Sequence, residues 1–215
     1  MYCPAHFEEP RLSEMLRLMA AFPLATVIAQ GPSGLVADHI PLMHEGEGAL
    51  AVKLVGHVAR GNPLWQCAEG QELLVVFQAP STYISPNWYA TKRDAGKVVP
   101  TWNYAVVHAT CTLEAIHEPQ RVLDIVTRLT DVHEAGQAHP WRVADAPADY
   151  TEKLLGHIVG IELQVHRLQG KWKVSQNQPS ANRHTVVEGL LAAGTDAHAH
   201  MAELVRLGAT PKPRP

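Results

Sequence analysis

The chain has 215 residues, of which 46% are hydrophobic and 18% are charged, so it carries enough apolar material for a large globular core. Its formal net charge of −3, from 18 basic and 21 acidic residues, argues against strong nonspecific binding to nucleic acid. Three scattered cysteines and the lack of an apolar run of about 18 residues predict a cytoplasmic protein with no membrane association.

The first predicted element is a helix that follows Pro10 and ends before Pro23, because apolar residues recur between them at spacings of three and four. Short β-like segments separated by glycine-rich turns come next, at residues 24–29, 34–43, 49–55, 72–77 and 98–114. Their connections are too short for helical crossovers. We therefore expect antiparallel strands that form a barrel or a sandwich.

The second half of the chain begins with an amphipathic helix after Pro119, which ends near Gly136, and a shorter helix at 148–155. Strands at 158–168 and 171–176 are predicted to form a hairpin at Gln169-Gly170. Two further helices follow, one with Ser180 as its N-cap and one opened by Thr195. The prediction is a single α+β domain over residues 1–210, with a flexible Pro-rich tail at 211–215.

A glycine-bracketed block, Gly56-His57-Val58-Ala59-Arg60-Gly61-Asn62-Pro63, is the first candidate for chemistry. A guanidinium, an imidazole and backbone N–H groups ahead of a proline that can start a helix are able to bind a phosphate dianion. The alternative is that Arg60 and Asn62 only close a surface turn.

Two Trp-containing segments, residues 98–104 and 171–179, mix aromatic, amide, hydroxyl and basic side chains. This mixture suits a ligand with a flat ring, a polar edge and an anionic tail, such as a flavin nucleotide. Strand alternation places Thr101 and Asn103 on one face and Trp102 and Tyr104 on the other, although an ordinary half-buried strand explains the same pattern.

Metal, nucleophile and nucleotide-fold motifs are missing from the sequence. The 13 histidines show no HExxH pattern, and His198 and His200 are spaced so that they point to different sides of a helix. There is no GxSxG, P-loop or Rossmann glycine pattern. We therefore expect no metal site, and a flavin bound by some other fold.

Five blocks, in order along nearly the whole chain, resemble the PaiB family of FMN-binding negative transcriptional regulators. They are Met-Tyr-Cys-Pro-Ala-His-Phe, Gly-His-Val-Ala-Arg-Gly-Asn-Pro, Tyr-Ile-Ser-Pro-Asn-Trp-Tyr-Ala-Thr-Lys, Val-Pro-Thr-Trp-Asn-Tyr and Lys-Trp-Lys-Val-Ser-Gln-Asn-Gln-Pro. The resemblance implies a split antiparallel β-barrel of the Greek-key, FMN-binding type with flanking helices. It also implies a homodimer that holds FMN at the subunit interface.

The resemblance also implies which residues contact the flavin. Those expected beside the flavin are Asp38, His39, Ile40, Pro41, Gly56, His57 and Val58, and those expected at its phosphate are Arg60 and Asn62, followed by Pro63. Weaker candidates for the ring edge or ribityl chain are Lys97, Thr101 and Asn103, and those expected to reach across from the partner subunit are Trp172, Ser175, Gln176 and Asn177.

Three functions remain open from the sequence. The first is a dimeric FMN-binding repressor that acts on DNA directly or through a transcription partner. The second is an FMN-dependent oxidoreductase that uses NAD(P)H or a small-molecule substrate, with His57, Tyr83 or Tyr104 as proton donor. The third is a small-ligand or heme-binding split barrel, with His57 or a C-terminal histidine as the axial ligand of a heme.

Overall fold

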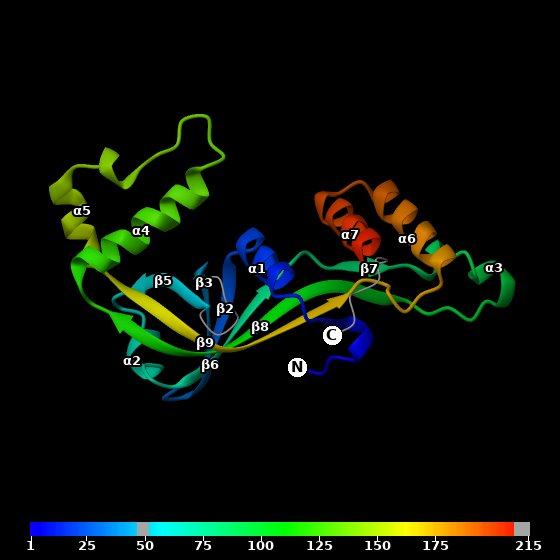
Figure 1. The fold of residues 1–215 in the computed structure, drawn as a ribbon, viewed down its shortest axis with the longest axis horizontal. Helices are drawn as coiled ribbons and strands as arrows, with labels where there is room; N and C mark the ends of the chain where they lie inside the picture. Colours follow the sequence, from blue (N-terminus) through cyan, green and yellow to red (C-terminus); the bar gives the residue numbers. More distant parts are fainter. Residues whose placement is uncertain (47–51, 209–215) are drawn as a thin grey trace. The chain divides into compact units, whose positions relative to one another are not determined.

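A computed structural model of the chain describes residues 1–46 and 52–208 (Figure 1). Its helices are η1 (Ala5–Phe7), α1 (Leu12–Ala21), α2 (Leu64–Cys67), η2 (Pro86–Trp88), α3 (Lys92–Ala95), α4 (Pro119–Glu134), η3 (Val143–Asp145), α5 (Ala148–Leu155), α6 (Ser180–Ala193) and α7 (Asp196–Leu207). Its strands are β1 (Glu8–Glu9), β2 (Leu24–Gly31), β3 (Gly34–Pro41), β4 (Met43–Glu45), β5 (Lys53–Ala59), β6 (Glu72–Gln78), β7 (Thr82–Ile84), β8 (Thr101–Ile116) and β9 (Ile158–Lys173). None of these helices is long and apolar enough to cross a bilayer.

The strands of the described residues form one nine-stranded sheet with the order β3-β2-β6-β8-β9-β5-β4. In addition, β1 pairs with β9 and β7 pairs with β8. Six of these pairs, β1–β9, β2–β3, β2–β6, β4–β5, β5–β9 and β7–β8, run antiparallel, as the short connections predict. The expected class of α+β with an antiparallel sheet is therefore confirmed.

The chain divides into two compact units, which are described separately. Unit 1 comprises residues 1–15, 78–107 and 169–215, and unit 2 comprises residues 16–77 and 108–168. The strands β8 and β9 contribute residues to both. The single domain expected over 1–210 stays a prediction, and the tail at 211–215 lies outside the described residues.

One hydrophobic cluster of unit 2 lies between α4 and the sheet. Val122, Ile125 and Leu129, which recur on one face of α4, pack against Val55 of β5 and Ile116 of β8. This is the apolar face that the sequence periodicity predicts. Figure 1 shows α4 and α5 together over the β5 side of this unit.

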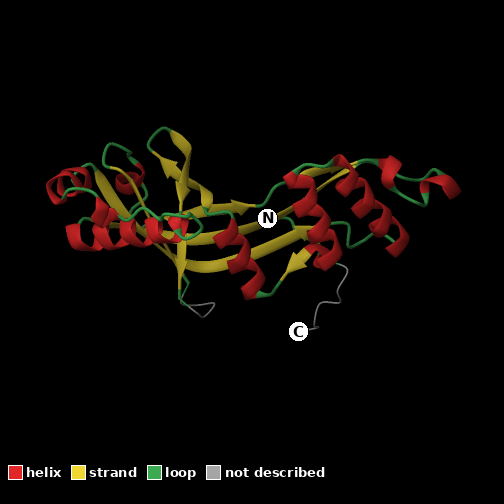
Figure 2. Ribbon diagram, turned by 90° about the horizontal axis from the view of Figure 1, so that it is seen from above, coloured by secondary structure: helices red, strands yellow, loops and turns green. Residues whose placement is uncertain are grey.

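In unit 1 the helices α6 and α7 pack against each other, as Figures 1 and 2 show from two directions. Thr195 caps α7 by accepting a hydrogen bond from the His198 backbone N–H at 3.3 Å, as predicted. The predicted cap of α6 is wrong by one residue. Pro179 is the N-cap, and Ser180 is already helical.

The hairpin predicted at Gln169-Gly170 is wrong, because β9 runs without a turn from Ile158 to Lys173. Gly170 pairs with Glu9 of β1. A Cβ on Gly170 would lie 2.8 Å from the Glu9 carbonyl oxygen and 3.0 Å from Trp172 Cζ3. Glycine is therefore needed here for close backbone approach rather than for a turn.

Other boundaries differ from the expected ones. The strand predicted at 34–43 is interrupted at Leu42, which separates β3 from β4. For the strand predicted at 49–55, residues 49–51 lie outside the described part, and the described strand β5 begins at Lys53. The strand predicted from Val98 begins at Thr101, and the short strand β7 was not predicted.

Candidate functional site

The predicted flavin residues form two groups, one in each unit. The unit 2 group consists of the end of β3 and the segment from Gly56 to Pro63. A Cβ on Gly56 would lie 2.8 Å from both the Leu42 Cδ2 and the Pro41 carbonyl oxygen, so glycine lets these segments approach. Asn62 Nδ2 also donates to Asp38 Oδ1 at 2.9 Å. The structure therefore brings together two of the blocks that the sequence singled out.

Most of the polar groups proposed to bind phosphate in this group already have protein partners. Arg60 donates from Nε to the Gly156 carbonyl at 2.7 Å and from Nη2 to the Ile158 carbonyl at 2.8 Å. Asn62 Oδ1 accepts from the Leu64 backbone N–H at 2.8 Å. These contacts match the alternative in which Arg60 and Asn62 close a turn. A phosphate role for them stays a prediction, and these hydrogen bonds would compete with it.

The remaining residues of the unit 2 group differ in exposure. Ile40 and Val58 are buried in the core, whereas His39 and Pro41 are exposed. Pro63 is exposed and is the N-cap of the four-residue helix α2. Flavin contacts by Ile40 and Val58 would therefore have to come from their backbone atoms.

His57 lies on the face of β5 opposite to Gly56. Val55, two residues earlier, packs against α4, whereas Gly56 faces Ile40, Pro41 and Leu42. Burial lowers the pKa of His57, which favours the neutral imidazole, and its buried Nδ1 has no hydrogen-bond partner.

The unit 1 group is built on the first residues of β8 and the end of β9. Lys173 Nζ donates to Thr101 Oγ1 and, at 2.6 Å, to the Trp102 carbonyl. Asn103 Nδ2 donates to Ser175 Oγ at 2.9 Å. Trp102 instead stacks edge-on against Tyr83, with ring centroids 6.1 Å apart. The predicted alternation of Thr101 and Asn103 against Trp102 is confirmed.

Two buried oxygen atoms in this group have no partner. Thr82 on β7 is directly paired with Asn103 on β8, and the two residues are 4% and 1% exposed. Thr82 Oγ1 and Asn103 Oδ1 each lack a hydrogen bond to any residue in 1–46 or 52–208. Because an unpaired buried polar atom costs about 1–3 kcal/mol, these atoms are suited to accept a donor from a bound molecule.

Lys171 and Lys173 are functional candidates that the sequence reasoning did not select. Lys171 is buried, donates to the Tyr2 carbonyl at 3.0 Å and lies 5.2 Å from the centre of the Tyr104 ring. Within residues 1–46 and 52–208, neither ammonium group has a carboxylate within ion-pair distance. The Lys-Trp-Lys alternation, which puts both lysines on one face of β9, is the signal that could have identified them.

The positive charges of Lys171 and Lys173 disfavour each other. Burial, and secondly the positive charge of Lys171, lower the pKa of Lys173. A bound anion would relieve both the desolvation and the repulsion. The pair therefore has the character of an anion site.

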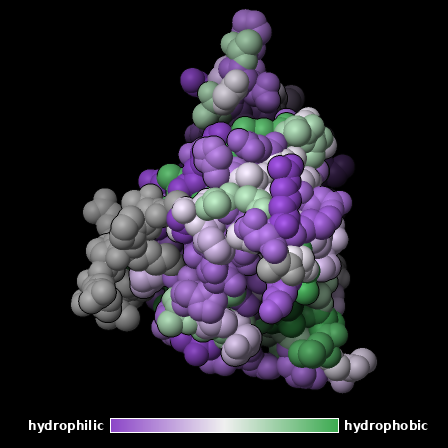
Figure 3. All heavy atoms as spheres, turned by 90° about the vertical axis from the view of Figure 1, so that its right-hand side faces the viewer, coloured by the Kyte–Doolittle hydropathy of each residue, from purple (hydrophilic) through white to green (hydrophobic). Residues whose placement is uncertain are grey.

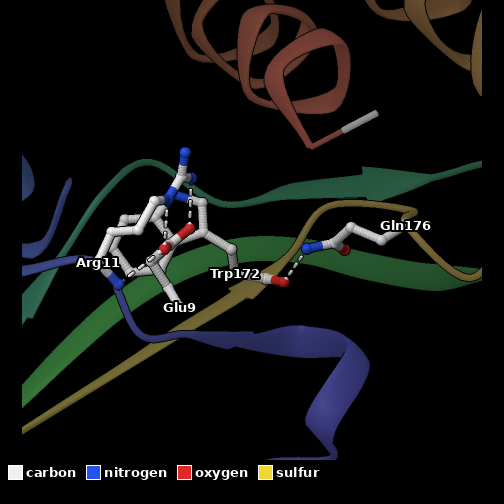
Figure 4. A network of polar contacts seen from close by, with 4 residues as sticks. All are labelled: Glu9, Arg11, Trp172 and Gln176. Atoms are coloured by element: carbon white, nitrogen blue, oxygen red, sulfur yellow. Dashed lines mark hydrogen bonds and ion pairs between the residues drawn. The ribbon is translucent and has the colours of Figure 1, made fainter. Parts of the chain in front are cut away.

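The other predicted residues of unit 1 lie as follows. Trp172 is buried beside Gly170, next to the Glu9–Arg11 ion pair, and its carbonyl accepts a hydrogen bond from Gln176 (Figure 4). Gln176 Oε1 accepts from the Val174 backbone N–H at 2.8 Å, so this amide closes the local turn. Asn177 and Lys97 are exposed.

Ser175 has a φ of 65°, in the left-handed region that non-glycine residues seldom adopt. Strained backbone of this kind is concentrated at functional sites. It occurs here in the same turn as the predicted contacts Gln176 and Asn177, directly after Lys173 and Val174.

These residues fit FMN in unit 1. Within the described residues, two ammonium groups without carboxylate partners suit its phosphate, and the unpartnered oxygens of Thr82 and Asn103 suit the ring N–H or the ribityl hydroxyls. No group of three or more His, Cys, Asp or Glu side chains in the described part of the chain could hold a metal ion.

The family model described as "Putative FMN-binding domain" matches residues 1–167. The chain belongs to this FMN-binding family. FMN is the cofactor that membership assigns to it. Together with the similarity to the PAI 2 protein described next, this confirms the resemblance to the PaiB family.

Curated relatives align over almost the full length. An uncharacterised protein of Emericella nidulans is 31% identical over 242 residues, covering 96% of each chain. The protease synthase and sporulation protein PAI 2 of Bacillus subtilis is 29% identical over 206 residues, covering 95% of this chain and 96% of that protein.

Solved structures share the fold at low sequence identity. The FAD and heme binding protein of Mycobacterium smegmatis has a TM-score of 0.60 and 20% identity, covering 87% of this chain and 80% of that chain. The flavocytochrome Anf3 of Azotobacter vinelandii has a TM-score of 0.58 and 14% identity, covering 77% and 69%. The split-barrel flavoprotein fold is thereby confirmed.

Proposed function

We propose that this chain is a homodimeric FMN-binding regulator of the PaiB type, which holds the flavin at its subunit interface and represses gene expression. The observation that carries the flavin part is the unit 1 cluster. It combines Lys171 and Lys173, which lack carboxylate partners among the described residues, with the unpartnered buried oxygens of Thr82 and Asn103.

We assign the FMN phosphate to Lys171 and Lys173, with Thr101 as a further donor. Charge-assisted hydrogen bonds from two ammonium groups fit a dianion. Thr82 and Asn103 would orient the flavin by accepting from its donors, and Tyr104 stays close to Lys171. When bound, FMN supplies reversible electron or hydride chemistry.

The dimer is supported by apolar surface in unit 1. Val99, Tyr83 and Trp102 are exposed, which is the kind of surface that enters interfaces. Independently of these three residues, the side of the molecule drawn in Figure 3 is largely hydrophilic, with hydrophobic residues gathered at its lower right. Sedimentation or light scattering in solution tests the dimer, and a monomer that still binds FMN would contradict the interface proposal.

The regulatory role is supported by similarity to the sporulation protein PAI 2 of Bacillus subtilis. The net charge of −3 favours action through a protein partner over direct reading of DNA. The three cysteines form no disulfide within the described part of the chain, which agrees with the reducing cytoplasm in which such a regulator works.

A second candidate function is an FMN-dependent oxidoreductase that uses NAD(P)H or a small-molecule substrate. It is favoured by the fold shared with a flavocytochrome and with an FAD and heme binding protein. In this case Tyr83, which is exposed, is available as a proton donor.

One set of measurements separates these functions. FMN titration, followed by absorbance, tests binding of the cofactor. NAD(P)H oxidation by the FMN-loaded protein supports the oxidoreductase, whereas redox-dependent binding to a promoter fragment or a transcription partner, without turnover, supports the regulator. If the protein does not bind FMN, both proposed functions are contradicted.

A further inference from the structure

A pocket of about 320 Å³ lies within unit 2, between α4, the η3–α5 segment and the beginning of β9. Its lining is mainly apolar and includes Leu123, Val126, Trp141, Tyr150 and Leu154, with His57 of β5. It contains no Asp, Glu, Lys or Arg side chain.

Three large side chains that line this pocket are more exposed to solvent than core residues usually are. Trp141, Tyr150 and Leu154 are 48%, 54% and 45% exposed, although all three line the pocket. Leaving aromatic side chains in water costs free energy that burial under a ligand would recover. The pocket is therefore suited to an apolar molecule with a flat ring.

His57 adds one specific polar group to this lining. Its Nδ1 is buried and has no hydrogen-bond partner among the described residues, and burial lowers the pKa of the imidazole, which favours the neutral ring. Three other polar residues line the pocket: Thr151, whose hydroxyl already donates to the Pro147 carbonyl at 3.2 Å, and Tyr150 and His157, which are exposed to solvent. A ligand with one hydrogen-bonding group would satisfy Nδ1.

We propose that this pocket binds a small aromatic molecule with a single hydroxyl or carbonyl group, of the phenol or quinone class, at a site separate from FMN. Its ring lies among Leu123, Trp141 and Tyr150, and its oxygen forms a hydrogen bond with His57. The pocket volume is at the lower end of the range for small-molecule sites, about 300–1,000 Å³, which limits the ligand to one or two fused rings.

Because no Asp, Glu, Lys or Arg side chain lines this pocket, it is unsuited to binding the phosphate of FMN. The predicted flavin contact of His57 stays a prediction, and this proposal gives its side chain a different partner. The two ideas differ in one measurable respect, because a separate site predicts that FMN and the aromatic ligand bind at the same time.

The test uses 1-naphthol as the probe and naphthalene as its counterpart without a hydroxyl, with binding measured by equilibrium dialysis. We expect naphthol to bind more tightly than naphthalene, and His57→Leu to remove that preference. Ala146→Phe, which fills the pocket, should weaken naphthol binding at least about tenfold. Ala144→Phe is the matched control, because Ala144 is exposed and does not line this pocket.

Val126→Trp is a second filling variant in case Ala146→Phe does not fold, and circular dichroism checks both. The proposal is overturned if naphthol does not bind, if the filling variants and Ala144→Phe bind it equally, or if saturating FMN displaces it. FMN binding is followed separately by absorbance. Failure of this proposal is therefore distinguishable from failure of the FMN assignment.

Discussion

Replacing Lys173 with methionine removes one positive charge from the proposed phosphate site while keeping most of the side-chain volume. In the structure this ammonium donates to Thr101 Oγ1 and the Trp102 carbonyl, and it has no carboxylate partner within residues 1–46 and 52–208. Loss of a hydrogen bond to a charged group costs about 1.5–3 kcal/mol. FMN binding should therefore weaken about 10- to 150-fold.

Riboflavin, which lacks the phosphate, distinguishes loss of this contact from general damage. We expect Lys173→Met to bind riboflavin as the parent protein does, with both flavins titrated by fluorescence. Lys153→Met, an exposed lysine of α5, is the charge-matched control and should change neither affinity. Arg60→Ala, tested in parallel, measures the competing phosphate assignment.

Two outcomes would refute the reasoning. One is an equal loss of FMN and riboflavin affinity in Lys173→Met, which would mean that the lysine supports the fold rather than the phosphate. The other is unchanged FMN binding in Lys173→Met together with a selective loss of FMN, but not riboflavin, in Arg60→Ala. That result would assign phosphate binding to Arg60 instead of Lys173.

Three further predictions follow from the packing and the titratable groups. Gly189→Ala should destabilise the protein by about 1–3 kcal/mol in urea unfolding, because the added Cβ would lie 2.5 Å from the Trp88 ring. Gly136→Ala, which has open space around the added Cβ, should not destabilise it, and equal effects of the two substitutions would contradict this prediction. Burial lowers the pKa of His44 and His57, so both contribute stability that is present above their unfolded pKa of about 6.5 and is lost as pH falls through the folded pKa. Asn at both positions should flatten the fall in melting temperature below pH 6.5 relative to the parent, and an unchanged slope would count against it. Burial raises the pKa of Cys111 to about 12, so a thiol reagent should modify Cys3 and Cys67 in the native protein and Cys111 only after unfolding, as mass spectrometry would show; early labelling of Cys111 would contradict its burial.

Much of the fold was predictable because its signals are local. The apolar spacing after Pro119 predicted α4, and short glycine-rich connections predicted antiparallel strands. Thr195 predicted the start of α7. Each of these patterns depends on residues within a few positions of one another, so each element can be predicted from the sequence alone.

The error at Gly170 shows where local reasoning fails. A glycine after Gln169 resembles a two-residue turn, but its partner is Glu9, more than 150 positions earlier. Only the folded chain shows that the missing side chain makes room for the Glu9 carbonyl. Close approach and a turn both select glycine, so the sequence could not distinguish them.

For the candidate site, too, some features follow from the sequence and others only from the folded structure. The five sequence blocks determined the family and its cofactor, because their residue types and order are specific without any knowledge of geometry. Which side chains are free to bind was decided by tertiary structure. Arg60 looks available in the sequence but spends two of its donors on the carbonyls of Gly156 and Ile158, about one hundred positions later. Lys173 also donates to two protein acceptors, Thr101 Oγ1 and the Trp102 carbonyl, but the folded chain places it beside the like charge of Lys171. The availability of a polar group depends on neighbours that only folding brings together.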